Sequence, residues 1–288
     1  MTSSASLAGS AQTGTSSRTE LITRGPAEAL AGLLDLDPLS ADEPLPALWH
    51  WVYLLERPRQ SDLGPDGHPT HGIPAPPGPG QLRMFAGGRV CLRTPLHFDQ
   101  AATRTTRVVR TIGKQGASGP LTFVTVRSEI EQQGHLAIFD EQDIVYRPRG
   151  GALLAPSGAG APADPVEPGL VLHVDPVLLF RFSALTYNAH RIHYDPVYAA
   201  HEGYPGLVVH GPLQALLMGE LMRRAGAALV GQKFVYRLVA PTFGEQRLTA
   251  APPTTGGASA QVQDGALRVT ATSALRPYSS AGSSWPPE

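Results

Sequence analysis

Hydrophobic and polar positions follow two periodicities in the first half of the chain. Between residues 45 and 56, apolar side chains recur at i, i+3, i+4 and i+7, which is typical of one buried face of a helix. A Pro- and Gly-rich stretch follows, and after it come β-branched or alternating runs separated by turn residues. These runs predict the strands of an antiparallel sheet at residues 89–96, 104–114, 120–132 and 134–146.

The second half of the chain repeats this organisation. A strand is predicted at 170–174 and a helix at 211–228, where Leu213, Leu216 and Leu217 fall on one face and Pro212 suits the first turn. Further strands are predicted at 232–240, 246–251, 258–264 and 266–275. The pattern therefore indicates an α+β fold with two similar halves, each a helix and a sheet.

Composition places the domain boundaries. Residues 149–169 are rich in Pro, Gly and Ala and are predicted to link an N-terminal domain at 21–148 to a C-terminal domain at 170–276. Residues 1–20 are predicted to be a disordered lead-in and 277–288 a flexible tail. A second Pro- and Gly-rich stretch, 64–80, lies inside the N-terminal domain, and a loop of this length is often functional, so we expect it to rim a pocket.

The charge balance excludes several classes of partner. The 288 residues contain 23 Lys and Arg against 24 Asp and Glu, for a formal net charge of -1, which gives no general electrostatic attraction for nucleic acid or an anionic membrane.

No uninterrupted apolar run reaches the length of about 18 residues expected of a membrane span, and the N-terminus lacks a secretory signal. Cys91 is the only cysteine, so the chain can form no internal disulfide. A cytoplasmic protein is predicted.

The densest polar cluster lies in residues 180–199, FRFSALTYNAHRIHYDPVYA, and is followed by GLVVHGPL at 206–213. These segments resemble the motif of MaoC-type hot-dog hydratases of enoyl thioesters, Ser-Gly-Asp-x-Asn-Pro-Ile-His-x-Asp-Pro followed by a His-Gly step into the central helix. On that motif His193 takes the position of the catalytic histidine, and His210 and Gly211 take the helix entry. Asn188 stands where the family has its catalytic aspartate.

The version of the motif with Asn188 and His190 resembles one branch of this family. The branch contains mitochondrial-type hydroxyacyl-thioester dehydratases and bacterial mesaconyl-C4-CoA (3-methylfumaryl-CoA) and itaconyl-CoA hydratases. LPALWHW, RMFAGG, GKQGASGPLTFVTV and EQDIVYR in the first half resemble the same branch, so the resemblance covers roughly residues 20 to 250. It implies a double hot-dog fold of two antiparallel sheets, each wrapped around a central helix. The C-terminal domain is expected to be catalytic and the N-terminal domain to shape the pocket.

Hydration of an enoyl thioester needs a base for water, a proton for the α-carbon and donors for the enolate oxygen. His193, whose type has an unperturbed pKa of about 6.5, can take the proton of water and return it. Asn188 cannot titrate, but it can hold the water or orient the imidazole. The backbone N–H groups at Gly211, at the start of the helix, can bind the developing oxyanion.

The second proton-transfer group remains open at this point. His193 can act alone, or a neighbour can contribute; the secondary candidates are His190, Tyr187, Asp195 and His210. Because Asp195 directly precedes Pro196, its position favours a turn or helix-capping role.

A CoA substrate also needs cations for its phosphates. The weak candidates for substrate binding are arginines and a lysine near predicted turns or strand ends: Arg83, Arg89, Lys114 and Arg181. Arg191, or an arginine from the N-terminal domain, is the candidate partner for a distal carboxylate on the acyl group. The sequence does not choose among these residues.

The resemblance implies an enzyme without a cofactor, because CoA is part of the substrate. His190 and His193 have a spacing compatible with metal ligation, but no third ligand follows at a familiar spacing, so no metal is predicted. The predicted activity is reversible hydration of a short branched enoyl-CoA, first of all mesaconyl-C4-CoA to citramalyl-CoA. The alternatives are an itaconyl-CoA hydratase, a 3-hydroxyacyl-thioester dehydratase, a hot-dog thioesterase and a non-enzymatic acyl-CoA-binding protein. A homodimer is the expected assembly.

Overall fold

Antiparallel strands form one continuous sheet in the computed structural model, which describes residues 14–116, 119–150, 169–238, 240–252, 257–264 and 266–277. The strands of the first half are β1 (Thr15–Leu21), β2 (Gln81–Leu92), β3 (Ala101–Gly116), β4 (Gly119–Gln132) and β5 (His135–Pro148). Those of the second half are β6 (Leu170–Val174), β7 (Gln232–Leu238), β8 (Gln246–Ala251), β9 (Gly257–Asp264) and β10 (Ala266–Pro277). The expected antiparallel strands are therefore present, with β6 and β8 at the predicted bounds.

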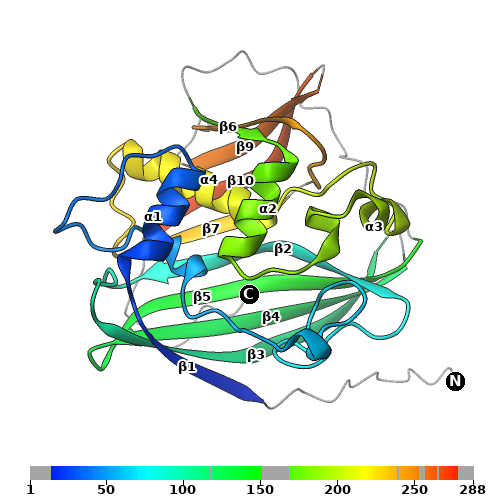
Figure 1. Ribbon diagram of the computed structural model, residues 1–288, viewed down its shortest axis with the longest axis horizontal. Coiled ribbons are helices and arrows are strands. Elements are labelled where there is room, and N and C mark those ends of the chain that lie inside the picture. Colours follow the sequence, from blue (N-terminus) through cyan, green and yellow to red (C-terminus); the bar gives the residue numbers. More distant parts are fainter. Residues whose placement is uncertain are drawn as a thin grey trace, which may run out of the picture.

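The strand order reveals an internal repeat. The order is β1-β3-β4-β5-β2-β7-β10-β9-β8-β6, so the second half mirrors the first and the two halves join where β2 pairs with β7. The double hot-dog fold is confirmed, with the strands of both halves merged into a single curved sheet (Figure 1). Because the halves share one sheet, a cavity between the sheet and its covering helices can draw residues from both.

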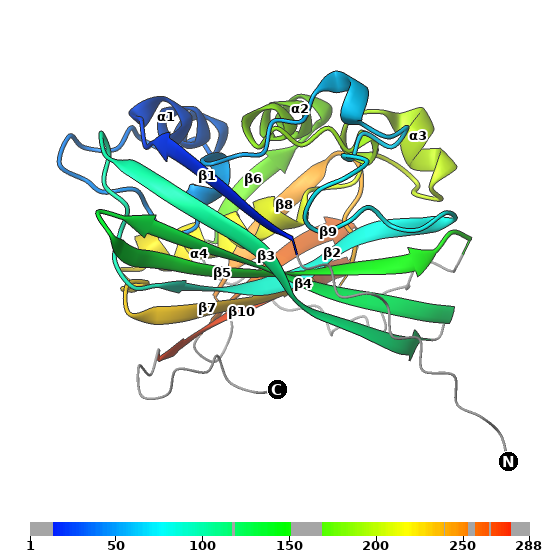
Figure 2. The ribbon, with the colours of Figure 1, turned by 90° about the horizontal axis from the view of Figure 1, so that it is seen from below.

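The helices lie along one side of that sheet (Figure 2). They are α1 (Arg24–Leu33), α2 (Pro176–Leu185), α3 (Pro196–His201) and α4 (Gly211–Arg224), with short 3-10 turns at Trp49–Val52, Gln60–Asp62 and Arg191–His193. None of the helices in the described part of the chain has the length and apolar composition needed to cross a bilayer.

Helix α4 is the central helix of the core. Its side chains Leu213, Leu216, Leu217 and Met218 are at most 1% exposed and pack against strands of the second half. Burial of each such side chain stabilises the fold by about 1.5–3 kcal/mol, so these contacts fix the helix and its N-terminus relative to the sheet. The predicted helix at 211–228 is confirmed, ending four residues early.

The predicted helix at 45–56 is wrong. Only Trp49–Val52 forms a single 3-10 turn, because Leu48 before it and Leu54 after it adopt left-handed backbone conformations with φ of 69° and 55°. The apolar side chains are nevertheless buried, Leu48 and Trp49 at 1% exposure each. The spacing thus indicated burial correctly, while an irregular segment supplies it in place of a helix.

The predicted lead-in at 1–20 is also wrong where the structure describes it. Residues 15–20 belong to β1, an edge strand that pairs antiparallel with β3 from Thr15 opposite Arg107 to Leu21 opposite Ala101. The tail prediction fails at Pro277, which ends β10, and residues 278–288 lie outside the described residues. Of the linker predicted at 149–169, residues 151–168 also lie outside them.

Candidate active site

The end of helix α2 places Asn188 at the candidate site. Tyr187, at φ 53°, donates its N–H to the carbonyl of Ala184 at 3.2 Å, and Asn188 donates to that of Ser183 at 2.8 Å. This pair of bonds ends the helix in a Schellman motif, in which a left-handed residue turns the chain sharply away from the axis. The side-chain Oδ1 of Asn188 then accepts the N–H of His190 at 3.0 Å, which leaves its amide N–H₂ group to donate elsewhere.

His193 is buried and held by one ring nitrogen. Its Nδ1 lies 2.7 Å from the carbonyl oxygen of Val208, and because a carbonyl only accepts, Nδ1 carries the proton. Burial, and then the neighbouring His190, lowers the pKa of His193 from 6.5 to about 3. The imidazole is therefore neutral near pH 7, and its Nε2 is an unprotonated base.

A second imidazole stacks on that of His193. The ring of His210 lies 3.7 Å from it at an angle of 18°, and His210 Nε2 contacts the hydroxyl of Ser183 at 2.9 Å. Burial, and then His193, keeps the pKa of His210 well below 6.5. Two stacked imidazoles repel each other strongly when both are charged, so His210 is neutral beside His193. Its ring packs flat against that of His193 and restricts the plane that the His193 ring can adopt.

The N-terminus of α4 lies beside these rings. Gly211 begins the helix, Pro212 has no N–H, and neither Gly211 nor Leu213 has an acceptor for its N–H in the described part of the chain. A Cβ atom on Gly211 would lie 2.3 Å from a methyl group of Leu238 and 2.8 Å from the ring of Phe85. Glycine is needed there to let the helix approach the sheet, and its free N–H and the helix dipole favour a negatively charged oxygen.

A loop from the N-terminal half completes the cluster. Asp66 accepts from the N–H of His68 at 3.0 Å and from its ring Nδ1 at 3.0 Å, and the ring of His68 lies 4.1 Å from that of His190. Arg191 anchors the loop, because its backbone N–H donates to the carbonyl of Asp66 at 2.9 Å. A Cβ on Gly67 would lie 1.8 Å from the carbonyl oxygen of Ala189, so the two backbones are in direct contact.

The electrostatics of this loop resemble those of His193. Burial lowers the pKa of His68 to about 4, although the hydrogen bond to Asp66 acts in the opposite direction. For Asp66, burial raises the pKa, but the bonds and charge of His68 outweigh it and the net value is about 2. An ionised carboxylate therefore holds a neutral imidazole in one tautomer, as an orienting carboxylate does in many acid–base sites.

His193, His210, Asn188, Gly211 and His68 line one cavity of about 1330 Å³ between the sheet and the helices. Residues of the predicted loop at 64–80 form part of its wall, which confirms that the loop rims a pocket. The volume exceeds the roughly 300–1,000 Å³ usual for drug-sized ligands and suits a long substrate such as an acyl-CoA. The predicted residues that line it are His193, Asn188, Gly211, His190, Tyr187, His210 and Arg83.

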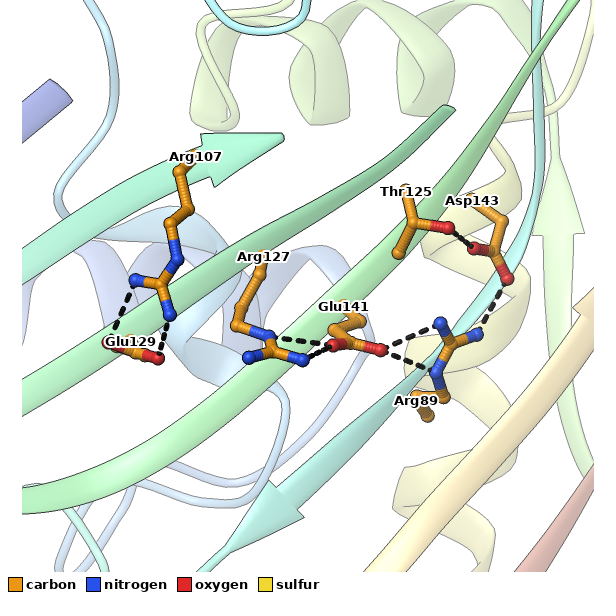
Figure 3. Close-up of polar contacts among 7 residues, drawn as sticks. All are labelled: Arg89, Arg107, Thr125, Arg127, Glu129, Glu141 and Asp143. Atoms are coloured by element: carbon orange, nitrogen blue, oxygen red, sulfur yellow. Dashed lines mark hydrogen bonds and ion pairs between the residues drawn. The ribbon is translucent and has the colours of Figure 1, made fainter. Parts of the chain in front are cut away.

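Arg89 is not in the cavity. It lies on the opposite face of the sheet, where it pairs with Glu141 at 2.7 Å and Asp143 at 2.8 Å (Figure 3). Glu141 also pairs with Arg127, and its side chain is only 1% exposed. Because Glu141 and Asp143 already neutralise the guanidinium of Arg89, and because Arg89 lies outside the cavity, its position does not support the prediction that it binds a CoA phosphate.

The other predicted polar residues outside the cavity have structural roles or exposed positions. Asp195 accepts from the N–H of Tyr198 at 3.0 Å, caps α3 and pairs with Arg191 at 2.6 Å, so neither side chain reaches the reaction centre. Lys114 is exposed, with its ammonium group over the ring of Phe123 at 5.3 Å, and Arg181 is exposed on α2.

The sequence analysis missed Asp66, His68 and Glu202. The last is a buried carboxylate 3.8 Å from Nε2 of His190. Asp66, His68 and His190 have potential ligand atoms within 4.8 Å of one another, an arrangement that can hold a metal ion. Spacing gave no signal for it, because the loop and His190 are more than a hundred residues apart; the DGH sequence inside a pocket-rimming loop was the available clue.

Comparison with known proteins agrees with this geometry. The family model of hydroxyacyl-thioester dehydratase type 2 matches residues 48–244. The chain is 49% identical over 257 residues to the mesaconyl-C(4)-CoA hydratase of Chloroflexus aurantiacus, covering 85% of this chain and 90% of that protein. It is 25% identical over 256 residues to the mitochondrial hydroxyacyl-thioester dehydratase type 2 of Schizosaccharomyces pombe, covering 79% and 85%. The crystal structure of HtdX from Mycobacterium tuberculosis matches with a TM-score of 0.64 at 14% identity, covering 92% of this chain and 100% of that one, a likeness of fold alone.

Proposed function

We propose, since the chain belongs to the hydroxyacyl-thioester dehydratase type 2 family, that it reversibly hydrates mesaconyl-C4-CoA to citramalyl-CoA. The observation that carries the chemistry is the arrangement of three groups around one cavity: a neutral His193 with Nε2 free, the amide of Asn188 and the open N-terminus of α4. The proposed substrate is that named for the mesaconyl-C(4)-CoA hydratase of Chloroflexus aurantiacus, to which the chain is 49% identical over 257 residues.

The reaction begins with the thioester carbonyl at the start of α4. Hydrogen bonds from the backbone N–H groups of Gly211 and Leu213 withdraw electrons from the conjugated double bond. Water lies between Nε2 of His193 and the amide of Asn188, which donates to the water oxygen. Nε2 takes one proton as that oxygen bonds to the β-carbon, and the electron pair of the double bond moves onto the thioester oxygen as an enolate.

The imidazolium of His193 then gives its proton to the α-carbon as the enolate collapses, which restores the base and completes the addition of one water molecule. The low pKa of His193 suits this return step, because a buried imidazolium is a strong acid. The imidazolium of His193 forms only while the enolate is present, because the negative charge of the enolate offsets the free-energy cost of a buried positive charge. One histidine can therefore serve both proton transfers.

The test is to follow the loss of enoyl-thioester absorbance with mesaconyl-C4-CoA, itaconyl-CoA, crotonyl-CoA and a longer enoyl-CoA, for the wild type and His193→Ala. We expect rapid turnover of mesaconyl-C4-CoA that the variant lacks. Turnover of the monocarboxylic substrates alone would identify a 3-hydroxyacyl-thioester dehydratase. Binding without turnover of any of them would identify an acyl-CoA-binding protein.

The remaining expectations belong to the same proposal. The chemistry uses no cofactor, so dialysis of the enzyme against a chelator should leave its rate unchanged. A homodimer in the cytoplasm is proposed, and light scattering after size exclusion together with cell fractionation tests both statements.

A further inference from the structure

Arg83 on β2 is a cation without a partner in the cavity wall. Two other arginines that line the cavity have one: Arg18 pairs with Glu20 at 2.7 Å, and Arg104 pairs with Glu56 at 3.1 Å. The guanidinium of Arg83 makes no hydrogen bond or ion pair with any side chain or backbone group in the described part of the chain. A half-buried guanidinium without hydrogen-bond acceptors in the protein is costly, so its position favours an anion that the protein itself does not supply.

The groups nearest to Arg83 are already engaged. Tyr146 lies opposite it on β5, and its hydroxyl donates to the carbonyl of Ala75 at 2.5 Å. Asp66 contributes an attractive charge, but its two oxygens accept from the backbone and ring of His68. Burial lowers the pKa of Arg83, although the guanidinium stays charged at any physiological pH.

Arg83 also lies on the side of β2 that faces the reaction centre. Phe85, two residues further along the strand, points to the same side and lies against Gly211 at the start of α4. Two residues of a strand span about 7 Å, which is comparable to the reach of an arginine side chain. Arg83, His68 and His193 line the same cavity, so the guanidinium shares this space with the proposed catalytic imidazole.

We infer that Arg83 binds the free carboxylate of a dicarboxylic enoyl-CoA and thereby selects this substrate class. The inference rests on the proposed function. In mesaconyl-C4-CoA the carboxylate is bonded to the carbon that receives water, so an anchor at Arg83 also places that carbon against Nε2 of His193. A planar guanidinium can hold a carboxylate through two parallel hydrogen bonds, which fixes orientation as well as position. This assigns Arg83 to the acyl group and not to the CoA phosphates, which the long pantetheine arm separates from the reaction centre.

The test compares two substrates that differ in this group alone. In 3-methylcrotonyl-CoA a methyl group replaces the carboxylate of mesaconyl-C4-CoA. For Arg83→Met we expect kcat/KM with mesaconyl-C4-CoA to fall roughly 100-fold, as when one charged hydrogen-bonding partner is lost. The inhibition constant of 3-methylcrotonyl-CoA against the wild type and the variant should agree within about threefold, because neither binding mode uses the guanidinium. Arg181→Met, on the exposed face of α2, is the matched control and should change neither value.

The outcomes separate this inference from the proposed function. A wild type that does not hydrate mesaconyl-C4-CoA overturns the proposed function and with it the need for a carboxylate anchor. A wild type that does hydrate it, combined with an Arg83→Met variant whose inhibition constant for 3-methylcrotonyl-CoA rises as much as kcat/KM for mesaconyl-C4-CoA falls, assigns Arg83 to the CoA moiety and overturns the inference. An Arg83→Met variant with unchanged kcat/KM overturns it as well. Thermal unfolding of each variant confirms that the comparison is made on folded protein.

Discussion

The two faces of the N-terminal half of the sheet treat charge in opposite ways. On the outer face, Arg89, Arg127, Glu141 and Asp143 form a ladder of ion pairs across β2, β4 and β5 (Figure 3). On the cavity face, Arg83 of the same strand β2 has no such partner, and the imidazoles near it are held neutral by burial. Charge is thus neutralised within the protein on the outer face and left for a ligand on the cavity face.

A β-bulge separates these two environments. Arg83 and Arg89 are six residues apart and would share a face of a regular strand, but the register of β2 against β5 shifts between Phe85 and Gly87. The extra residue shifts the alternation by one, so odd-numbered residues such as Arg83 and Phe85 face the cavity before the bulge, whereas odd-numbered Arg89 faces outward after it. One inserted residue therefore places Arg83 and Arg89 on opposite faces of the sheet. We expect substitutions on the cavity face to change the rate and those on the outer face to change the stability.

The largest effect is expected for His193→Asn. The amide of asparagine can still donate to the carbonyl of Val208, as Nδ1 does now, but it supplies no base. Hydration of mesaconyl-C4-CoA should slow about 1,000-fold, the range for loss of a general acid–base group, while thermal unfolding changes little. His135→Asn, at the exposed first residue of β5, is the control. A His193→Asn variant that retains a tenth of the activity would place the base elsewhere.

On the outer face, Arg89→Met should lower the free energy of unfolding by about 2–3 kcal/mol, because buried Glu141 then keeps only Arg127 as a partner. Arg107→Met is the matched control, since its partner Glu129 is partly exposed and the loss should stay below about 1 kcal/mol. Urea unfolding measures both, and kcat/KM of either folded variant should match the wild type. Equal losses of stability, or a slower reaction in Arg89→Met, would contradict the division between the faces.

A smaller effect on the rate is expected where the N-terminal loop meets the reaction centre. His68→Gln and Asp66→Asn should each lower kcat about 10- to 100-fold with little change in KM, because the dyad packs against His190 and fixes its position beside His193. Activity within twofold of the wild type would show that the loop only closes the cavity. Elemental analysis of the same proteins tests for a metal ion at Asp66, His68 and His190, and we expect none. A stoichiometric metal that is lost in both variants would show that these residues bind a metal instead of positioning His190.

The sequence predicted an element correctly where the spacing of its hydrophobic residues matched a regular strand or helix with one buried face. Strands β3 to β5 and β7 to β10 alternate or are β-branched, and α4 has a continuous apolar face, so the strands of both halves and the helix of the second half could be predicted, whereas helix α1 of the first half was missed. Strand β1 was not predicted because it is an edge strand whose side chains are exposed or only partly buried. Its Thr, Ser and Arg residues therefore show no hydrophobic alternation. The segment at 45–56 failed for the opposite reason, since burial on a helical spacing does not require helical backbone.

The site divides in the same way. Asn188, His193 and Gly211 lie close together in the sequence and could be predicted from one motif, and the structure brings them to one cavity. Arg89 was misplaced because a position near a predicted strand end does not tell which face of the sheet a side chain occupies, and the bulge in β2 places Arg89 on the face opposite Arg83. Asp66 and His68 could not be linked to His190, because the contact depends on how a loop of one half folds over the other.

The smallest effect, counted for one histidine and one unit of pH, concerns the buried histidines of the cavity face. The unfolded chain protonates them near pH 6.5, whereas the folded protein holds the pKa of His193 at about 3, that of His68 at about 4 and that of His210 well below 6.5. Between these values the unfolded state binds more protons, so the free energy of unfolding falls as the pH drops below about 6.5, by up to about 1.4 kcal/mol per pH unit for each histidine.

Urea unfolding between pH 7.5 and 5 measures this slope. The window lies above the region in which the low pKa of Asp66, about 2, contributes, so the histidines dominate the comparison. His193→Asn should reduce the slope of the unfolding free energy against pH by the contribution of one histidine. Arg89→Met removes no histidine, so it should lower the free energy of unfolding by the same amount at every pH. A slope that Arg89→Met changes and His193→Asn does not would mean that the outer face, and not the cavity, carries the proton-linked part of the stability.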